Sequence, residues 1–177
     1  MKKYFIYILL LVLITVSRQT LAADPEVVRF VDLNRYSGKW YEIARLPNSF
    51  ESKDARNIVA SYSLNSGGTI RVENSCIEKN GALNKVVGLA KVTDPVTNAK
   101  LAVSFFDIFG FRPIWGDYWI LGLGENYSYS VVGDRSRKYA WILARNPQLN
   151  KNQLEEAIQI LKKNGFESDR LIYPKQS

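Results

Sequence analysis

Val31–Ala44, with the sequence VDLNRYSGKWYEIA, is the stretch that decides the expected fold of this 177-residue chain. The residues before Gly38 predict a short helical turn, Gly38 interrupts it, and the segment from Trp40 onward predicts a strand. Turn-forming residues then recur at short intervals and separate further segments rich in β-branched and aromatic residues. The chain is therefore expected to continue as an antiparallel sheet.

Seven more strands are expected after the strand that follows Gly38. They are Ile58–Leu64, Thr69–Ile77, Lys85–Thr93, Lys100–Phe106, Tyr118–Leu123, Tyr127–Val132 and Tyr139–Ala144. Connectors rich in Gly, Asn, Asp and Pro join most of them over short distances, as in a meander. We expect an all-β fold, an eight-stranded antiparallel up-and-down β-barrel, because closing the sheet removes both of its exposed edges.

One α-helix is expected after the last barrel strand, packed outside the barrel. Asn152 is the predicted N-cap, and Gly165 is predicted to end the helix. Apolar side chains between Leu154 and Leu161 follow three- and four-residue spacing, which gives one stripe suited to the outer face of a sheet. Leu171–Tyr173 predicts a short final strand.

The first 22 residues have the pattern of a secretory signal peptide. Two lysines precede the apolar run Phe5–Val16, and small residues stand before the expected cleavage site after Ala22. The run is shorter than the ~20 residues needed to span a bilayer. We expect residues 1–22 to be removed and residues 23–177 to form one domain, exported to the periplasm or secreted in soluble form.

Attachment of a lipid to the new amino terminus is not expected. Lipoprotein signals place a cysteine directly after a Leu-x-x stretch, whereas here Leu21–Ala23 is followed by Asp24. The single cysteine of the chain is Cys76. Association with an outer membrane by other means stays open.

The composition points toward binding rather than catalysis. The chain contains no histidine and one cysteine, which excludes Ser-His-Asp and Cys-His catalysis, histidine-ligated zinc or haem, and an intrachain disulfide. We expect no metal site and no cofactor. Removing the leader lowers the formal net charge from +7 to +4, which is too small for a nucleic-acid footprint.

Strand alternation assigns an inner face that mixes small residues with large rings. Such a face predicts a cavity for one small ligand, although a register slip of one residue would invert every assignment. The expected ligand-binding residues are Ala44, Ala60, Tyr62, Val72, Asn74, Cys76, Gly88, Ala90, Leu101, Val103, Phe105, Tyr118, Ile120, Tyr139 and Trp141. Glu42 also faces inward and is expected to pair with Arg145 or with a tyrosine hydroxyl rather than to catalyse.

Two connectors that share one end of such a barrel have unusual content. Phe105–Trp115 is too apolar for a solvated loop, so it is expected to cover a cavity mouth, to touch lipid, or to fold down onto the barrel. Gly133–Lys138 carries three positive side chains. An apolar mouth with a cationic rim suits a ligand with a long tail and an anionic head. The expected mouth residues are Phe109, Phe111, Trp115, Arg135 and Arg137.

Two motifs resemble those of the lipocalin family, and more specifically its bacterial lipocalin and apolipoprotein D-like subgroup. They are Gly38-Lys39-Trp40 and the arginine at the end of the last barrel strand, Arg145. The resemblance implies that Trp40 lies across a closed barrel end with Arg145 packed over it. The family's middle motif, usually Thr-Asp-Tyr, is replaced by Leu123–Tyr127 (LGENY).

The resemblance also implies a function, namely binding and carriage or storage of fatty acids, (lyso)phospholipids or similar small apolar molecules outside the inner membrane. Homodimer formation and peripheral membrane contact are compatible with it, and we expect no binding of nucleic acid. Two alternatives stay open. One is a lipocalin-fold enzyme that uses Cys76, although Glu73 and Glu78 would raise the pKa of that thiol. The other is a docking module with a filled barrel. We expect that the protein is not an enzyme.

Overall fold

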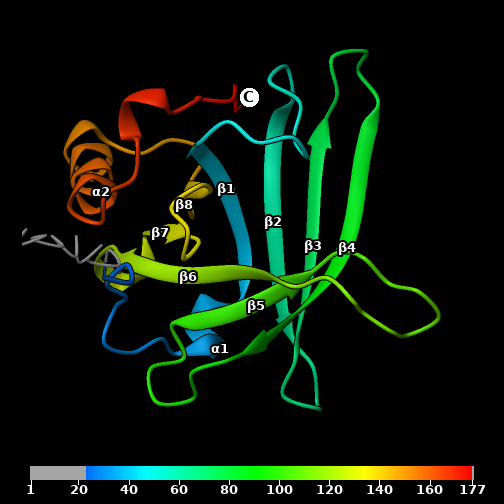
Figure 1. Cartoon of the computed structure of the whole chain (residues 1–177). Coiled ribbons are helices and arrows are strands. Elements are labelled where there is room, and N and C mark those ends of the chain that lie inside the picture. The colour runs from blue at the N-terminus through cyan, green and yellow to red at the C-terminus, as the bar shows by residue number, and fades with distance from the viewer. Residues whose placement is uncertain (1–22, 177) are drawn as a thin grey trace, which may run out of the picture.

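The computed structural model describes residues 23–176, which form a closed barrel of eight antiparallel strands in sequential order (Figure 1). The last strand returns to pair with the first. The strands are β1 (Gly38–Arg45), β2 (Arg56–Leu64), β3 (Ile70–Ile77), β4 (Leu83–Val92), β5 (Lys100–Ser104), β6 (Gly116–Leu123), β7 (Tyr129–Gly133) and β8 (Ala140–Ala144). The expected fold class is confirmed. The expected signal peptide, residues 1–22, lies outside the described residues.

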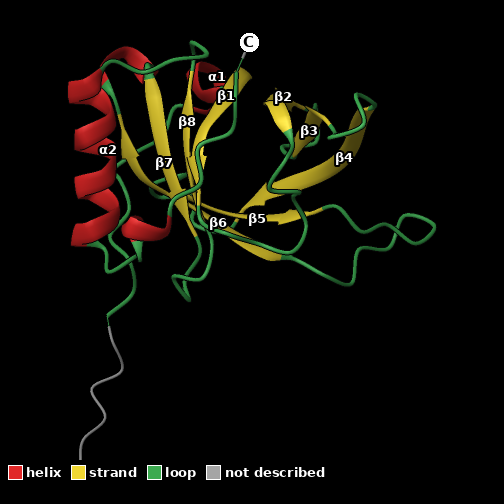
Figure 2. Cartoon of the chain, turned by 90° about the horizontal axis from the view of Figure 1, so that it is seen from above, coloured by secondary structure: helices red, strands yellow, loops and turns green. Residues whose placement is uncertain are grey.

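Helix α2 (Lys151–Lys163) runs along the outside of the barrel, as Figure 2 shows. Its N-cap is Asn150 and not Asn152, because Oδ1 of Asn150 accepts the backbone N–H of Gln153 at 2.9 Å. The predicted final strand is reduced to a single bridge between Ile172 and Arg45. The chain also contains the short helix α1 (Leu33–Tyr36) and the 3₁₀ turns η1 (Glu125–Tyr127) and η2 (Ser168–Arg170).

Apolar side chains form two separate layers, one inside the barrel and one between the barrel wall and α2. Two glycines make the second layer possible. A Cβ at Gly122 would lie 2.5 Å from Ile160 of α2, and a Cβ at Gly133 would lie 2.4 Å from Phe166. Since these contacts are too short for any larger residue, the glycines allow the helical segment to approach the wall closely.

Trp40 closes one end of the barrel and is fully buried there. Its Nε1 donates to the carbonyl oxygen of Tyr36 at 2.8 Å. The guanidinium of Arg145 lies 3.7 Å from the centre of the Trp40 ring and donates to the carbonyl oxygens of Arg35, Tyr36 and Lys39. The expected cation-to-ring contact is therefore present at this closed end.

Tyr127 connects the loops at the same closed end, even though its motif departs from the family pattern. Its hydroxyl oxygen accepts the backbone N–H of Asp32 at 2.9 Å. The guanidinium of Arg35 lies 4.4 Å from the centre of the Tyr127 ring. The altered motif thus still ties the turn before β7 to the segment that enters α1.

A β-bulge in β1 changes the expected inward face. The register between β1 and β8 shifts between Glu42 and Ala44, so that Glu42 pairs with Leu143 whereas Ala44 pairs with Ile142. Ala44 therefore packs in the layer beneath α2, and its assignment to the cavity is wrong. The extra residue turns Arg45 inward instead, because strict alternation is lost at a bulge.

The barrel wall is uneven at its open end. β4 pairs with β3 as far as Leu83, whereas its pairing with β5 covers only Leu89–Val92. Figure 1 shows β3 and β4 reaching well past β5. Within residues 23–176, no helix is both long and apolar enough to cross a membrane.

Candidate functional site

A cavity of about 1280 Å³ opens at the end of the barrel opposite Trp40. Its wall comes from the inner faces of the strands and from the loops at the open end. The predicted ligand-binding residues that line it are Ala60, Tyr62, Val72, Asn74, Cys76, Ala90, Leu101, Val103, Phe105, Tyr118, Tyr139 and Trp141. The structure thus gathers these side chains around one space, and their contact with a ligand stays a prediction.

Gly88 and Ile120 face inward but do not line the cavity. A Cβ at Gly88 would lie 2.6 Å from Cδ1 of Phe105, so the Phe105 ring covers this glycine. Ile120 is fully buried in the packed layer that also contains Trp40. Alternation identifies the face on which a residue lies, but it does not show how far along the barrel axis packed side chains fill the interior.

The expected apolar mouth is only partly formed. Trp115 lines the cavity, its Nε1 donates to the carbonyl oxygen of Arg112 at 2.8 Å, and the ammonium of Lys91 lies 4.2 Å from its ring centre. Phe109 and Phe111 are absent from the lining and are largely exposed. Their assignment to the mouth is wrong, because the middle of their loop leaves the barrel.

The expected cationic rim is formed only in part. Arg137 turns toward the end of α2, where its Nε donates to the carbonyl oxygen of Asn164 at 2.6 Å. Arg135 does line the cavity, but its Nε is 2.9 Å from a carboxylate oxygen of Asp24. Arg137 is thus directed away from the opening, and Arg135 is paired with Asp24, so the opening attracts an anionic ligand head less than expected.

Three tyrosines form the floor of the cavity. The hydroxyl of Tyr118 shares hydrogen bonds with Tyr36 at 2.7 Å and with Tyr62 at 3.0 Å, and Tyr36 also contacts Ser130 at 3.0 Å. Burial raises the pKa of Tyr36 to about 12 and raises the pKa values of Tyr62 and Tyr118 further above their usual range. The floor is therefore uncharged at neutral pH.

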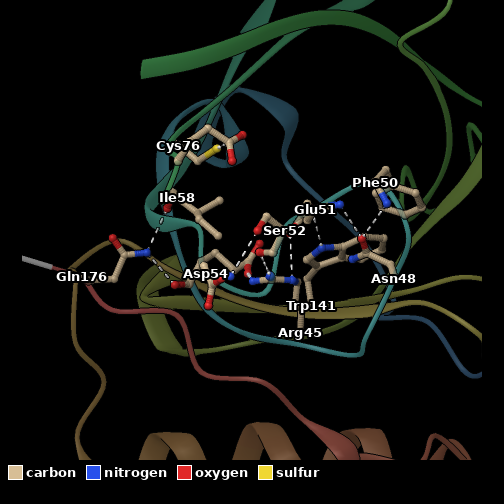
Figure 3. A network of polar contacts seen from close by, with 12 residues as sticks. Arg45, Asn48, Phe50, Glu51, Ser52, Asp54, Ile58, Cys76, Trp141 and Gln176 are labelled. Carbon is tan, nitrogen blue, oxygen red and sulfur yellow. Dashed lines mark hydrogen bonds and ion pairs between the residues drawn. The ribbon is translucent and has the colours of Figure 1, made fainter. Parts of the chain in front are cut away.

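A buried ionic cluster stands on the cavity wall near the opening, as Figure 3 shows for Arg45, Glu51 and Ser52. Nη1 of Arg45 lies 2.6 Å from Oε1 of Glu42, and Nε of Arg45 lies 3.0 Å from Oε2 of Glu51. Nη2 of Arg45 donates to the carbonyl oxygen of Ser52 at 2.6 Å, and Nε1 of Trp141 donates to Glu51 at 3.3 Å. The partner of Glu42 is thus Arg45, and the pairing expected with Arg145 or a tyrosine is wrong.

Two carboxyl groups share one guanidinium in this cluster. Burial, followed by the nearby charge of Glu51, raises the pKa of Glu42 to about 8 against the opposing effect of Arg45. At neutral pH the cluster therefore holds one proton more than two free carboxylates would. With that proton its net charge is zero, which suits an apolar surrounding.

Cys76 lines the cavity as a half-buried thiol. Burial raises its pKa, and the carboxylate of Glu78, whose Oε1 is 3.8 Å from Sγ, raises it further. Glu73 lies on the outer face, where it pairs with Arg71 at 2.9 Å. The thiolate needed for nucleophilic chemistry is therefore disfavoured at neutral pH.

The loop between β1 and β2 contributes wall residues that strand alternation does not reveal. Phe50, Glu51, Ser52 and Ala55 all line the cavity. The Phe50 ring lies 6.3 Å from that of Trp141, centre to centre, in a stacked arrangement. The available signal for this part of the wall was Phe50, a large aromatic residue within the polar run 48–54.

Comparison with known proteins shows to which family the chain is similar. The family model of the lipocalin-like domain matches residues 31–176. Temperature-induced lipocalin-1 of Arabidopsis thaliana is 35% identical over 157 residues, which cover 87% of this chain and 84% of the relative. The outer membrane lipoprotein Blc of Vibrio cholerae is 38% identical over 157 residues, with 86% and 88% covered. Apolipoprotein D of Bos taurus is 35% identical over 158 residues, with 86% and 80% covered.

Solved structures share the same architecture. Insecticyanin from the tobacco hornworm Manduca sexta superimposes with a TM-score of 0.70 at 25% identity, covering 88% of this chain and 86% of its own. Lobster apocrustacyanin A1 has a TM-score of 0.64 at 18% identity, with 81% and 79% covered, and shows the shared fold alone. The matched domain, together with relatives 35–38% identical along most of the chain, confirms the resemblance seen in the sequence and shows that this chain belongs to the lipocalin family.

Proposed function

We propose that this lipocalin binds and carries small apolar lipids, either fatty acids or (lyso)phospholipids, outside the inner membrane after residues 1–22 are removed. The observation that carries the proposal is the cavity of about 1280 Å³, whose inner half is lined by aliphatic and aromatic side chains over an uncharged floor. This volume exceeds the range of roughly 300–1,000 Å³ common for small-molecule pockets, so it can hold a long chain.

Affinity in such a cavity comes from buried apolar area. Each methylene that leaves water for contact with side chains such as Val72, Leu101 and Val103 contributes ~0.8 kcal/mol before the costs of association. Selectivity between chains that differ by one methylene is weak for the same reason. A carrier of a lipid class fits this cavity better than a receptor for one compound.

The charges near the opening favour a zwitterionic phospholipid head over a free carboxylate. Glu78, Asp117 and Asp134 line the cavity without an ion-pair partner among the described residues. The lining cations Lys85 and Arg135 are instead paired with Glu73 and Asp24. A carboxylate head would meet like charges, whereas the cation of a zwitterionic head would meet opposite ones. Within the proposed class, lysophospholipids are therefore favoured over fatty acids.

We also propose that the protein acts by binding and not by catalysis. The raised pKa of Cys76 keeps its thiol protonated, and Arg45 occupies Glu42. The open cavity argues against a docking module with a filled barrel. Relatives named outer membrane lipoproteins support export, although Asp24 stands where a lipidated cysteine would be expected. A homodimer stays a prediction.

Competition with a fluorescent fatty acid, using lysophosphatidylcholines of increasing chain length below their critical micelle concentrations, tests the proposal. We expect affinity to rise with each methylene, by about a factor of 3 to 4. Val103→Trp, which fills the cavity, should abolish binding, whereas Val87→Trp on the outer face of β4 should not. Affinity independent of chain length, or equal effects of the two tryptophans, would contradict the proposal.

Native mass spectrometry of protein purified from its own compartment adds an independent readout. A co-purified lipid near one per chain is expected. The same spectrum shows whether the chain begins at Ala23, which tests the proposed removal of residues 1–22.

A further inference from the structure

The loop between β5 and β6, residues 105–115, exposes a cluster of large apolar side chains. Figures 1 and 2 both show this loop projecting from the barrel as a hairpin, clear of the other elements. Its tip residue Phe109 is fully exposed. The other exposed apolar side chains of the loop are Phe105, Phe106, Ile108, Phe111 and Ile114.

The tip is a tight two-residue turn and not a loose loop. Ile108 and Phe111 exchange backbone hydrogen bonds at 2.8 and 2.9 Å, and Phe109 and Gly110 between them have φ angles of +50° and +85°. Such turns favour Asn-Gly, and a bulky residue with positive φ is disfavoured. An aromatic ring is thus held in water at a position where folding alone would favour asparagine.

The base of the hairpin neutralises its own charges. Arg112 lies 3.1 Å from the carboxylate of Asp107 and donates to the carbonyl oxygen of Ser104 at 2.9 Å. The other carboxylate oxygen of Asp107 accepts the backbone N–H of Gly110 at 2.9 Å. Because these charges and backbone donors have partners within the loop, moving the tip out of water leaves few unpaired polar groups.

The same loop also forms one side of the cavity opening. Phe106, Ile114 and Trp115 line the cavity, while Ile108 to Phe111 point away from it. Val86 of the neighbouring strand β4 also lines the cavity and is exposed. The apolar tip is therefore continuous with the route by which a lipid would enter.

We propose that residues 105–115 form a membrane-docking hairpin, which inserts Ile108, Phe109 and Phe111 into a lipid bilayer and places the cavity opening at its surface. The proposal rests on the proposed lipid-carrier function for its purpose. A bilayer fits better than a second copy of the chain, because a stable dimer buries about 800 Å² per partner and a two-residue hairpin tip offers a narrow, convex surface. Apolar and aromatic side chains above a neutralised base are suited to the interface of a bilayer.

Co-sedimentation of the chain lacking residues 1–22 with phosphatidylcholine vesicles tests the proposal. Phe109→Asn should weaken binding about tenfold, the effect expected for removing one buried phenylalanine from the bilayer. Phe30→Asn is the matched control, because Phe30 is also exposed, at 57%, but lies at the closed end of the barrel. Its neighbour Val31 donates its backbone N–H to the carbonyl oxygen of Thr97 in the β4–β5 connector at that end. Binding should persist in high salt and gain little from phosphatidylglycerol, because the hairpin carries no net charge.

The choice of asparagine separates docking from folding. Asn tolerates positive φ, so Phe109→Asn should keep or raise the melting temperature while vesicle binding falls. Affinity for soluble lysophosphatidylcholine should not change, because Phe109 lies outside the cavity lining. If the wild-type protein does not bind lysophosphatidylcholine, the carrier function is overturned. If the wild-type protein binds lysophosphatidylcholine but not vesicles, only the docking proposal is overturned.

Three results would overturn the docking proposal. The first is equal vesicle binding by the wild-type protein and Phe109→Asn, and the second is vesicle binding that disappears in high salt. The third is a wild-type protein that does not bind vesicles but dimerises with rising concentration, with Phe109→Asn abolishing the dimer. The last result would assign the hairpin to a second copy of the chain.

Discussion

The two ends of the barrel are built from the same alternating strands but differ in how their side chains are satisfied. At the closed end, Trp40 is fully buried, its indole N–H and the guanidinium of Arg145 have carbonyl acceptors, and Tyr127 ties the loops together. At the open end, β4 outruns β5, and Phe109 stands fully exposed. The first end is completed within the chain, whereas the second presents apolar surface that residues 23–176 do not cover.

This difference separates stability from binding along the barrel axis. Packed and hydrogen-bonded layers at the closed end contribute to the free energy of unfolding. The open end gives up such packing and gains an accessible cavity. The same kind of substitution should therefore lower the free energy of unfolding at the closed end and the lipid affinity at the open end.

The largest expected effect is the contrast between two tryptophans. Trp40→Ala should lower the free energy of unfolding by about 3–5 kcal/mol, because it empties a closed and fully packed site. Trp141→Ala removes a half-buried ring from the cavity wall, so its effect on unfolding should be smaller and its effect on lipid affinity larger. Urea denaturation and ligand titration of both variants measure this. Equal losses of stability would break the contrast.

A pH effect of intermediate size should come from Glu42. Because its folded-state pKa is raised to about 8, the stability that its proton provides is present below the unfolded pKa near 4.5 and is lost as pH rises toward 8. The free energy of unfolding should fall by roughly 2–4 kcal/mol across this window, and Glu42→Gln should remove the fall. Denaturation at a series of pH values measures it.

Glu73→Gln is the control for that experiment. Glu73 is partly exposed, and its pKa is lowered by Arg71 and Lys85, so its contribution is lost only as pH falls below its unfolded value. The fall between pH 4.5 and 8 should survive in this variant. A fall that persists in Glu42→Gln would assign the titration to another group.

The smallest expected effect concerns Cys76 at the open end. Since burial and Glu78 raise its pKa, iodoacetamide should alkylate Cys76 more slowly than a free cysteine peptide at neutral pH. Glu78→Gln should shift the rate profile to lower pH, and a saturating lipid should slow alkylation further. A rate above that of the peptide would revive the enzymatic alternative.

Several features of the site followed from the sequence because they depend on period and residue type. Two-residue alternation placed Ala60, Val72 and Leu101 on one inner face, and the structure gathers them around one cavity. The paired roles of Trp40 and Arg145 at the closed end followed from the family resemblance. Nothing in a pattern with period two signals an inserted residue, so the bulge that removed Ala44 and brought in Arg45 was missed.

Other features were missed because they depend on where a loop lies in space. Arg137 was expected beside the cavity, but the carbonyl end of α2 binds it. Phe109 was expected over the opening, but the hairpin that carries it leaves the barrel. Composition identified both loops as unusual without indicating the direction in which either would point.

The sequence by itself determined the barrel, the outer helix and most of the inner face, because hydrophobic periodicity and turn chemistry are local properties of the chain. The closed end followed from the family resemblance of its motifs. The tertiary structure decided which inner residues border empty space, which carboxyl groups share Arg45, and where the exposed hairpin stands. These depend on contacts between residues far apart in the chain, such as Phe105 over Gly88 or Trp141 with Glu51, and packing alone sets those distances.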